Sequence, residues 1–139
     1  MTRPVLVDTS VWINHFRNLP SVQVAMLQFW LDEDPDQVLL NEVVVTELLR
    51  GARDEAAAHT LRELLEQLPQ AEPLQRDDWL ASAHIYRLCR KSGLTIRSPM
   101  DCLIAAHAMR LRRPVLAMDR DFDAIASCVP LALHRALAQ

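Results

Sequence analysis

The stretch RPVLVDTSVWI, residues 3–13, ends a run of apolar residues with an aspartate, Asp8. Val5–Val7 has the composition of a short buried strand, and apolar side chains then recur at helical spacing over Thr9–Phe16. In open parallel sheets, ligands bind beyond the carboxyl ends of the strands. A strand that stops at Asp8 and passes into a helix therefore predicts a functional carboxylate at the edge of an α/β sheet.

The same alternation of strand and helix patterns continues along the chain. We expect helices over about residues 21–31, 42–50, 54–68, 77–91, 99–113 and 119–126. Further strands are expected at residues 38–40, 72–74, 115–118 and 131–133. This alternation predicts an α/β fold with a mostly parallel central sheet and helices on both faces, an α/β/α sandwich, formed by residues 1–139 as one domain.

The composition narrows the class of protein. A chain of 139 residues, with 50% hydrophobic and 24% charged residues, is typical of one soluble globular domain. Its three cysteines lack the pairing and the histidine spacing of a disulfide framework or a zinc site, which favours a reducing compartment. No apolar stretch approaches the length of a membrane span. We therefore expect a cytoplasmic protein with no membrane partner.

The net charge of -3 hides an uneven distribution. Four acids crowd one expected loop, namely Asp32, Glu33, Asp34 and Asp36. Basic residues dominate a later region whose only acid is Asp101, and they are Arg87, Arg90, Lys91, Arg97, Arg110, Arg112 and Arg113. A solvated helix face explains any one of these side chains, but as a group they are suited to a surface for phosphates.

Acidic residues are expected to meet at one edge of the sheet. Asp8 and Asp119 follow strands directly, and Asp101 lies in the first turn of a helix that begins at that same edge. Glu47 follows the strand at residues 38–40 within about two helical turns, close enough for its side chain to reach the edge. Asp121 is a candidate outer member, whereas Asp123 is expected to face solvent.

Asp101 is the most informative of these acids because it lies on the apolar side of its helix. The residues that share this side are Ile104, Ala105, Ala108 and Leu111. Burying several ionised carboxylates together is costly unless a positive charge compensates them. Oxygen ligands without histidine or cysteine favour Mg²⁺ or Mn²⁺ over zinc. We therefore interpret Asp8, Glu47, Asp101, Asp119 and Asp121 as candidate metal ligands.

Each of these residues also has a simpler interpretation. Asp119 could cap the next helix, Asp101 could be a first-turn acid favoured by the helix dipole, and Asp8 could be a turn residue. Glu47 could be a surface residue. The hydroxyl groups of Thr9, Ser10 and Ser98 suit contacts to a metal ligand or a phosphate, and they equally suit helix capping.

Four segments in this order, DTSVWI, TELLRG, SPMDCLIAAHA and MDRDFDAIA, resemble the PIN domain and, more narrowly, the VapC toxins of bacterial toxin–antitoxin pairs. The resemblance implies an endoribonuclease that depends on Mg²⁺ or Mn²⁺ and cleaves structured RNA, with transfer RNA as our expectation and ribosomal RNA as the other candidate. It maps the acids of the family onto the five candidate ligands above. We interpret Asp8 and Asp101 as the principal metal ligands, Asp119 as a ligand or a water-mediated holder, and Glu47 as a ligand or the residue that orients the attacking water.

The resemblance also implies a cognate VapB antitoxin, homodimerisation and hetero-oligomers with the antitoxin. An antitoxin arginine that enters the acidic pocket would pair with the carboxylates. Aromatic residues concentrate in the first two expected helices, where they either line a groove for a partner helix or pack in the core; they are Trp12, Phe16, Phe29 and Trp30.

Other classes of protein also place acids at such a sheet edge. A receiver-like signalling module that binds Mg²⁺ needs a suitably placed lysine, and the one lysine of this chain, Lys91, lies at the end of an expected helix. A dehalogenase-like phosphatase needs a second aspartate two residues after the first, where this chain has Ser10. A catalytically inactive PIN interaction domain leaves the retained acids unexplained.

Overall fold

Three short parallel strands form the centre of the molecule in the computed structural model, which describes residues 4–135. The strands β1 (Val5–Val7), β2 (Val38–Leu39) and β3 (Val115–Leu116) lie in the order β2-β1-β3. Val5 pairs with Val38 on one side of β1, and Leu6 pairs with Val115 on the other. Every strand residue is buried, which explains why the strands are continuously apolar rather than alternating.

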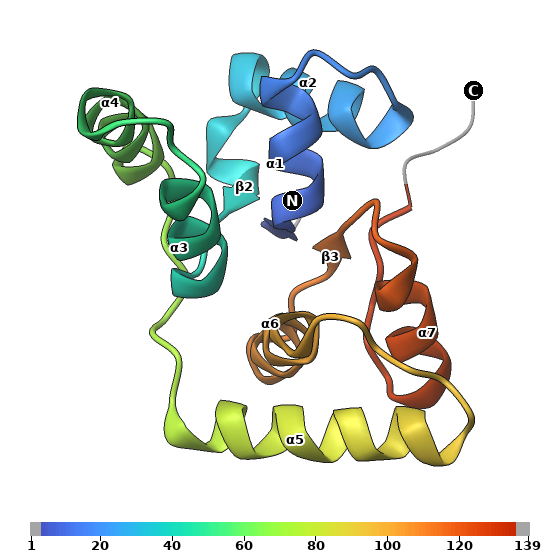
Figure 1. Cartoon of the computed structure of the whole chain (residues 1–139). Helices are drawn as coiled ribbons and strands as arrows, with labels where there is room; N and C mark the ends of the chain where they lie inside the picture. The colour runs from blue at the N-terminus through green and yellow to red at the C-terminus, as the bar shows by residue number, and fades with distance from the viewer. Residues whose placement is uncertain (1–3, 136–139) are drawn as a thin grey trace.

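Helices cover both faces of this sheet, as Figure 1 shows with α1 and α2 above the strands and α5 and α6 below them. In chain order the helices are α1 (Thr9–Phe16), α2 (Val22–Glu33), the 3₁₀ turn η1 (Pro35–Gln37), α3 (Glu42–Arg50), α4 (Glu55–Glu66), α5 (Arg76–Lys91), α6 (Pro99–Leu111) and α7 (Arg120–Cys128). The expected α/β/α sandwich with a parallel sheet is confirmed. Among the described residues, no helix combines the length and the apolar run needed to cross a membrane.

The first residues of the helices are fixed by side-chain caps. Ser21 accepts a hydrogen bond from the Val24 N–H at 3.0 Å, and Asn41 accepts one from the Val44 N–H at 3.0 Å. Each cap satisfies a backbone donor that has no partner inside the helix. The start of α3 at Glu42, as expected from the sequence, is therefore set by Asn41, and this places Glu47 in the second turn.

The strand expected at residues 72–74 is wrong, and the one expected at residues 131–133 is reduced to a single bridge. Over residues 72–74 the backbone groups bind side chains instead of a neighbouring strand: the Glu72 carbonyl accepts from His107, and the Leu74 N–H donates to Glu42. The chain pairs with the sheet two residues earlier, in a single bridge between Leu40 and Gln70. At residues 131–133, only one bridge forms, between Leu133 and Val115.

A buried polar network connects α3, α5 and α6. Asn41 Nδ2 lies 3.1 Å from His107 Nδ1, and His107 Nε2 lies 2.7 Å from the Glu72 carbonyl oxygen, so His107 carries its hydrogen on Nε2. Arg110 donates to both carboxylate oxygens of Asp78, at 2.8 and 3.0 Å. Arg110, one of the seven residues grouped above as a basic surface, is therefore engaged in a structural pair.

Candidate metal centre

Three carboxylates meet at the carboxyl edge of the sheet. Asp101, Asp119 and Asp121 each offer an oxygen atom, and these atoms lie within 4.8 Å of one another. Asp101 comes from the first turn of α6, while Asp119 follows β3 and caps α7 by accepting from the Asp121 N–H at 2.9 Å. Asp119 thus serves as a helix cap and as a member of this group at once.

Asp8, at the end of the central strand, lies outside this group of three but near Asp101. It is 3% exposed, and its charge acts on Asp101. Ser10 donates both its hydroxyl, at 2.7 Å, and its backbone N–H, at 3.1 Å, to Asp8 Oδ2. Asp8 Oδ1 is buried without a hydrogen-bond partner. The first turn of α1 therefore fixes one oxygen of Asp8 and leaves the other without a hydrogen-bond partner.

Asp101, like Asp8, has one carboxylate oxygen without a hydrogen-bond partner. Asp101 is 6% exposed, and the unpaired oxygen is its buried Oδ2. Burial raises the pKa of Asp101 to about 9, assisted by the hydrogen bond to Asp119 and by the charges of Asp8, Asp119 and Asp121. Burial likewise raises the pKa of Asp8 to about 6, because it outweighs the two hydrogen bonds from Ser10. The cluster, defined here as Asp8, Asp101, Asp119 and Asp121, carries more negative charge than its surroundings balance.

Glu47 lies beside this cluster rather than within the group of three oxygens. Its Oε1 accepts a hydrogen bond from the Thr9 hydroxyl at 2.7 Å, and its charge acts on Asp8. Asp121, the outer candidate from the sequence, is in fact 6% exposed and shares the group with Asp101. Asp123 is exposed, as expected, and pairs with Arg135 at 3.2 Å.

The hydroxyl residues have different roles in the structure. Thr9 holds Glu47, and Ser10 holds Asp8 while accepting from the Met118 N–H at 3.0 Å. Ser98 occupies the cap position of α6, but its side chain makes no capping bond, and its carbonyl accepts from the Asp101 N–H at 3.0 Å. Arg97, which the sequence placed only in a basic group suited to phosphates, in fact contacts Asp119 and Asp121, because the loop before α6 folds back onto α7.

The donor set of the cluster fits a divalent cation. Its four residues offer only carboxylate oxygens. Among the described residues, the group of three oxygens includes no histidine or cysteine ligand. Two of the oxygens, Asp8 Oδ1 and Asp101 Oδ2, are buried and unpaired, which is costly unless a cation satisfies them. Hard divalent ions prefer this chemistry.

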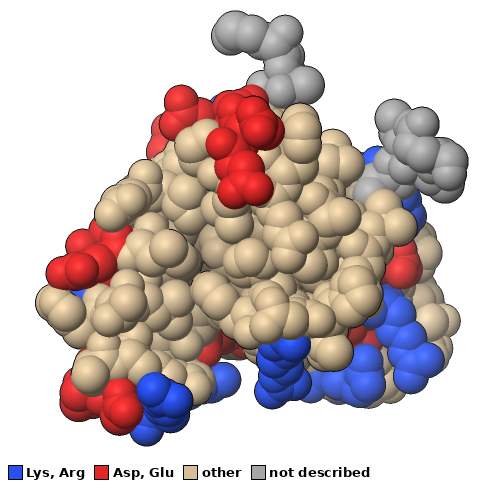
Figure 2. All heavy atoms as spheres, turned by 90° about the horizontal axis from the view of Figure 1, so that it is seen from above, with Lys and Arg blue, Asp and Glu red and all other residues tan. Residues whose placement is uncertain are grey.

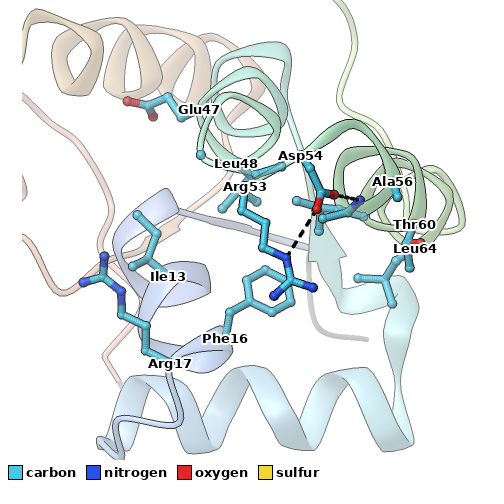
Figure 3. A pocket seen from close by; sticks show the side chains of 14 residues that line it. Ile13, Phe16, Arg17, Glu47, Leu48, Arg53, Asp54, Ala56, Thr60 and Leu64 are labelled. Carbon is cyan, nitrogen blue, oxygen red and sulfur yellow. Dashed lines mark hydrogen bonds and ion pairs between the residues drawn. The ribbon is translucent and has the colours of Figure 1, made fainter.

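An apolar groove of about 760 Å³ lies between α1, α3 and α4, with Glu47 in its wall. Figure 3 shows Phe16 reaching from α1 toward α4, where Leu64 lines the opposite side. Ile13, Phe16 and Leu64 are 37%, 46% and 47% exposed. Of the four aromatic residues considered for a partner groove, Phe16 lines it, and Trp12 and Trp30 belong to the core. Phe29 is exposed outside the groove.

Comparisons with known proteins agree with this fold. The family model described as the PIN domain matches residues 5–127. Ribonuclease VapC11 of Mycobacterium tuberculosis H37Rv is 38% identical over 122 residues, which is 88% of this chain and 91% of the relative. The structure resembles FitAcB from Neisseria gonorrhoeae, with TM-score 0.69, 25% identity and coverage of 95% and 97%. It also resembles VapBC-5 of M. tuberculosis, a member of the VapBC family of toxin–antitoxin systems, with TM-score 0.67, 23% identity and coverage of 96% and 99%.

The match to the family model extends over the strands, the four residues of the cluster and Glu47. It sets aside the receiver-like and dehalogenase-like alternatives, which belong to other families. The chain belongs to the PIN domain family and, within it, to the VapC group.

Proposed function

We propose that this protein is an endoribonuclease that depends on Mg²⁺ or Mn²⁺ and acts as the toxin of a toxin–antitoxin pair. The observation that carries the proposal is the pair of buried, unpartnered oxygens, Asp8 Oδ1 and Asp101 Oδ2, within a cluster of carboxylates. The similarity to a protein named Ribonuclease VapC11 supports RNA as the substrate.

The four acids of the cluster and Glu47 would have different roles in binding the metal ion. Asp8 and Asp101, which are buried and bear the bare oxygens, are the principal metal ligands. Asp119, at the cap of α7, and Asp121, in its first turn, complete the ligand set. Glu47, held by Thr9, either joins the ligands or orients the attacking water.

The bound cation would supply a Lewis acid that makes water easier to deprotonate and offsets the charge of the transition state. Ser10 contributes by holding Asp8 Oδ2, which leaves the unpaired Oδ1 for the cation. Since the carboxylates repel a phosphodiester, the RNA needs positive charge elsewhere on the surface. Figure 2 shows Lys and Arg side chains gathered along the lower and right edges of that view, whereas other surface Asp and Glu side chains gather at its upper edge.

The substrate that we propose is a structured RNA, transfer RNA or ribosomal RNA, in the cytoplasm. Residues 1–139 act as a single PIN domain, and we propose that the chain forms a homodimer and assembles further with its antitoxin.

The partner that we propose is a cognate VapB antitoxin, whose apolar segment occupies the groove between α1, α3 and α4. The exposed apolar side chains of the groove suit the apolar face of such a segment. Because Glu47 is in the wall of the groove, a segment seated there could carry an arginine to the carboxylates and so block them.

The experiment is to sequence RNA ends after expressing the protein with and without the product of the neighbouring gene. We expect specific breaks that bear 5′-phosphates, that the neighbouring product suppresses, and that are lost in Asp101→Asn. An inactive interaction domain is the rival, and it predicts the same RNA ends for the wild-type chain and the variant.

A further inference from the structure

Arg97 lies in the loop between α5 and α6 and contacts two acids of the cluster. Its Nη2 lies 3.5 Å from Asp119 Oδ1, and its Nε lies 3.8 Å from Asp121 Oδ2. Its backbone N–H also donates to Asp121 Oδ2 at 3.0 Å. The backbone bond anchors the residue beside the cluster, while the guanidinium adds a positive charge at its outer side.

These contacts divide the cluster into two parts. Asp119 and Asp121 share the charge of the guanidinium, whereas Asp8 Oδ1 and Asp101 Oδ2 have no hydrogen-bond partner. One positive charge does not balance four carboxylates, so Asp8 and Asp101 still attract a cation. Because the Arg97 side chain is 65% exposed, it is free to leave the carboxylates without disturbing the core.

A cation bound by Asp101, Asp119 and Asp121 would compete with Arg97 for the same oxygens. The group of three includes Asp119 and Asp121, and both already face the guanidinium. Two positive charges at such short range repel each other, and the contacts of 3.5 and 3.8 Å are long and exposed, hence weak. Cation binding is therefore expected to displace the guanidinium, which remains tethered at the rim by its backbone bond to Asp121.

We propose that Arg97 is an exchangeable counter-ion: it balances Asp119 and Asp121 while no metal ion is bound, gives way when a divalent cation binds, and then pairs with a phosphate of the RNA. This inference rests on the proposed function, since it takes the cluster as the metal site of a ribonuclease. A guanidinium suits both roles because its planar donors match carboxylate and phosphate oxygens alike.

The first test titrates the complete chain with MnCl₂ by calorimetry, without RNA. Arg97→Gln removes the competing charge and should bind Mn²⁺ about fivefold more tightly than the wild type. Arg97→Lys keeps the charge and should stay close to the wild type. The matched control is Arg62→Gln, which removes an exposed arginine paired with Glu66 at 2.8 Å on α4 and should leave Mn²⁺ affinity unchanged.

The second test measures RNA cleavage at saturating Mn²⁺. Loss of the phosphate contact should raise KM for the RNA about fivefold in Arg97→Gln and leave kcat within about twofold of the wild type. The combination of tighter metal binding with weaker RNA binding separates this role from a structural one, which would weaken both.

An unchanged or weaker Mn²⁺ affinity in Arg97→Gln, or an unchanged KM, overturns the counter-ion proposal and leaves the proposed function standing. A wild-type chain that binds no Mn²⁺ overturns the proposed function as well. The two failures are therefore distinguishable.

Discussion

Thr9 on α1 donates its hydroxyl hydrogen to Oε1 of Glu47 on α3 at 2.7 Å, across 38 positions of the sequence. The two helices begin after neighbouring strands, β1 and β2, so the bond ties the first turn of α1 to the second turn of α3 near the carboxyl edge of the sheet. It also fixes Glu47 beside Asp8. The precise position of this carboxylate therefore depends on a hydroxyl group that is distant in sequence.

Thr9→Val should lower the rate of RNA cleavage about tenfold, because Glu47 loses the donor that orients it. Thr9→Ser retains the hydroxyl and should keep most of the activity. The measurement is single-turnover cleavage at saturating metal, with thermal melting to show that both variants fold. Equal rates for the valine and serine variants would show that the bond has no part in the chemistry.

Ser10→Ala should weaken Mn²⁺ binding about tenfold, since Asp8 Oδ2 loses its 2.7 Å bond and the carboxylate gains freedom to rotate. The matched control is Ser127→Ala, which removes an exposed hydroxyl bonded to the Ala124 carbonyl on α7. Calorimetric titration with MnCl₂ measures both variants. Similar affinities for the alanine variant at Ser10 and the wild type would argue against Asp8 as a principal ligand.

The amino-acid sequence predicts the site better than it predicts the edges of the sheet. Asp8, Asp101 and Asp119 could be placed together because each one follows a strand or begins a helix, and parallel topology brings those points to one edge. The apolar side of α6 also predicted the burial of Asp101: Ile104, Ala105 and Ala108 on that side are buried, and Leu111 is partly exposed.

Contacts between distant side chains could not be predicted in the same way. The strand expected at residues 72–74 is absent because His107 and Glu42 take its backbone groups, and no local pattern indicates such partners. The contacts of Arg97 with Asp119 and Asp121 depend on the path of one loop. Spacing along the chain therefore locates the carboxylates but leaves the groups that hold them undetermined.

The stability of the metal-free protein should fall as the pH rises. The pKa of Asp101 is about 9 and that of Asp8 about 6 in the folded chain, above the ordinary value of about 4. The folded state therefore holds protons that the unfolded state releases, and stability is lost between about pH 4 and pH 6 for Asp8 and up to about pH 9 for Asp101. Asp101→Asn should melt above the wild type in EDTA, with a difference that grows across this range.

Mn²⁺ should stabilise the wild type but not Asp101→Asn, so that with Mn²⁺ the wild type melts at the higher temperature. A ligand present at 100 times its dissociation constant stabilises the folded state by about 2.7 kcal/mol. Thermal melts at pH 8 with and without MnCl₂ measure the effect. A pH-independent difference in EDTA, or equal stabilisation of Asp101→Asn by Mn²⁺, would contradict the placement of Asp101 among the ligands.

Asp78→Asn should lower the free energy of unfolding by about 1–3 kcal/mol, because Arg110 loses its charged partner in the buried network. Burial acts to raise the pKa of Asp78, but the bonds from Arg110 and from the Gln75 N–H outweigh it and hold the pKa below its ordinary value. The contribution of this pair is thus present above about pH 4 and lost as the pH falls further. Urea unfolding at pH 7 and pH 3 should show the difference only at pH 7. Asp123→Asn, which breaks the exposed pair with Arg135, should change stability by less than about 1 kcal/mol at either pH.

Phe16→Glu and Leu64→Glu should abolish binding of the antitoxin while leaving RNA cleavage intact. Both side chains are about half exposed in the free chain and line the apolar groove, so each substitution places a charge where an apolar segment would seat. Phe29→Glu is the matched control, since Phe29 is 59% exposed on α2 outside the groove. The measurement is co-purification with the neighbouring gene product, together with a cleavage assay of each variant alone. Because the four acids of the cluster do not line the groove, these variants should retain cleavage and should cleave RNA even when the antitoxin is present. Persistent inhibition would show that the antitoxin binds a different surface.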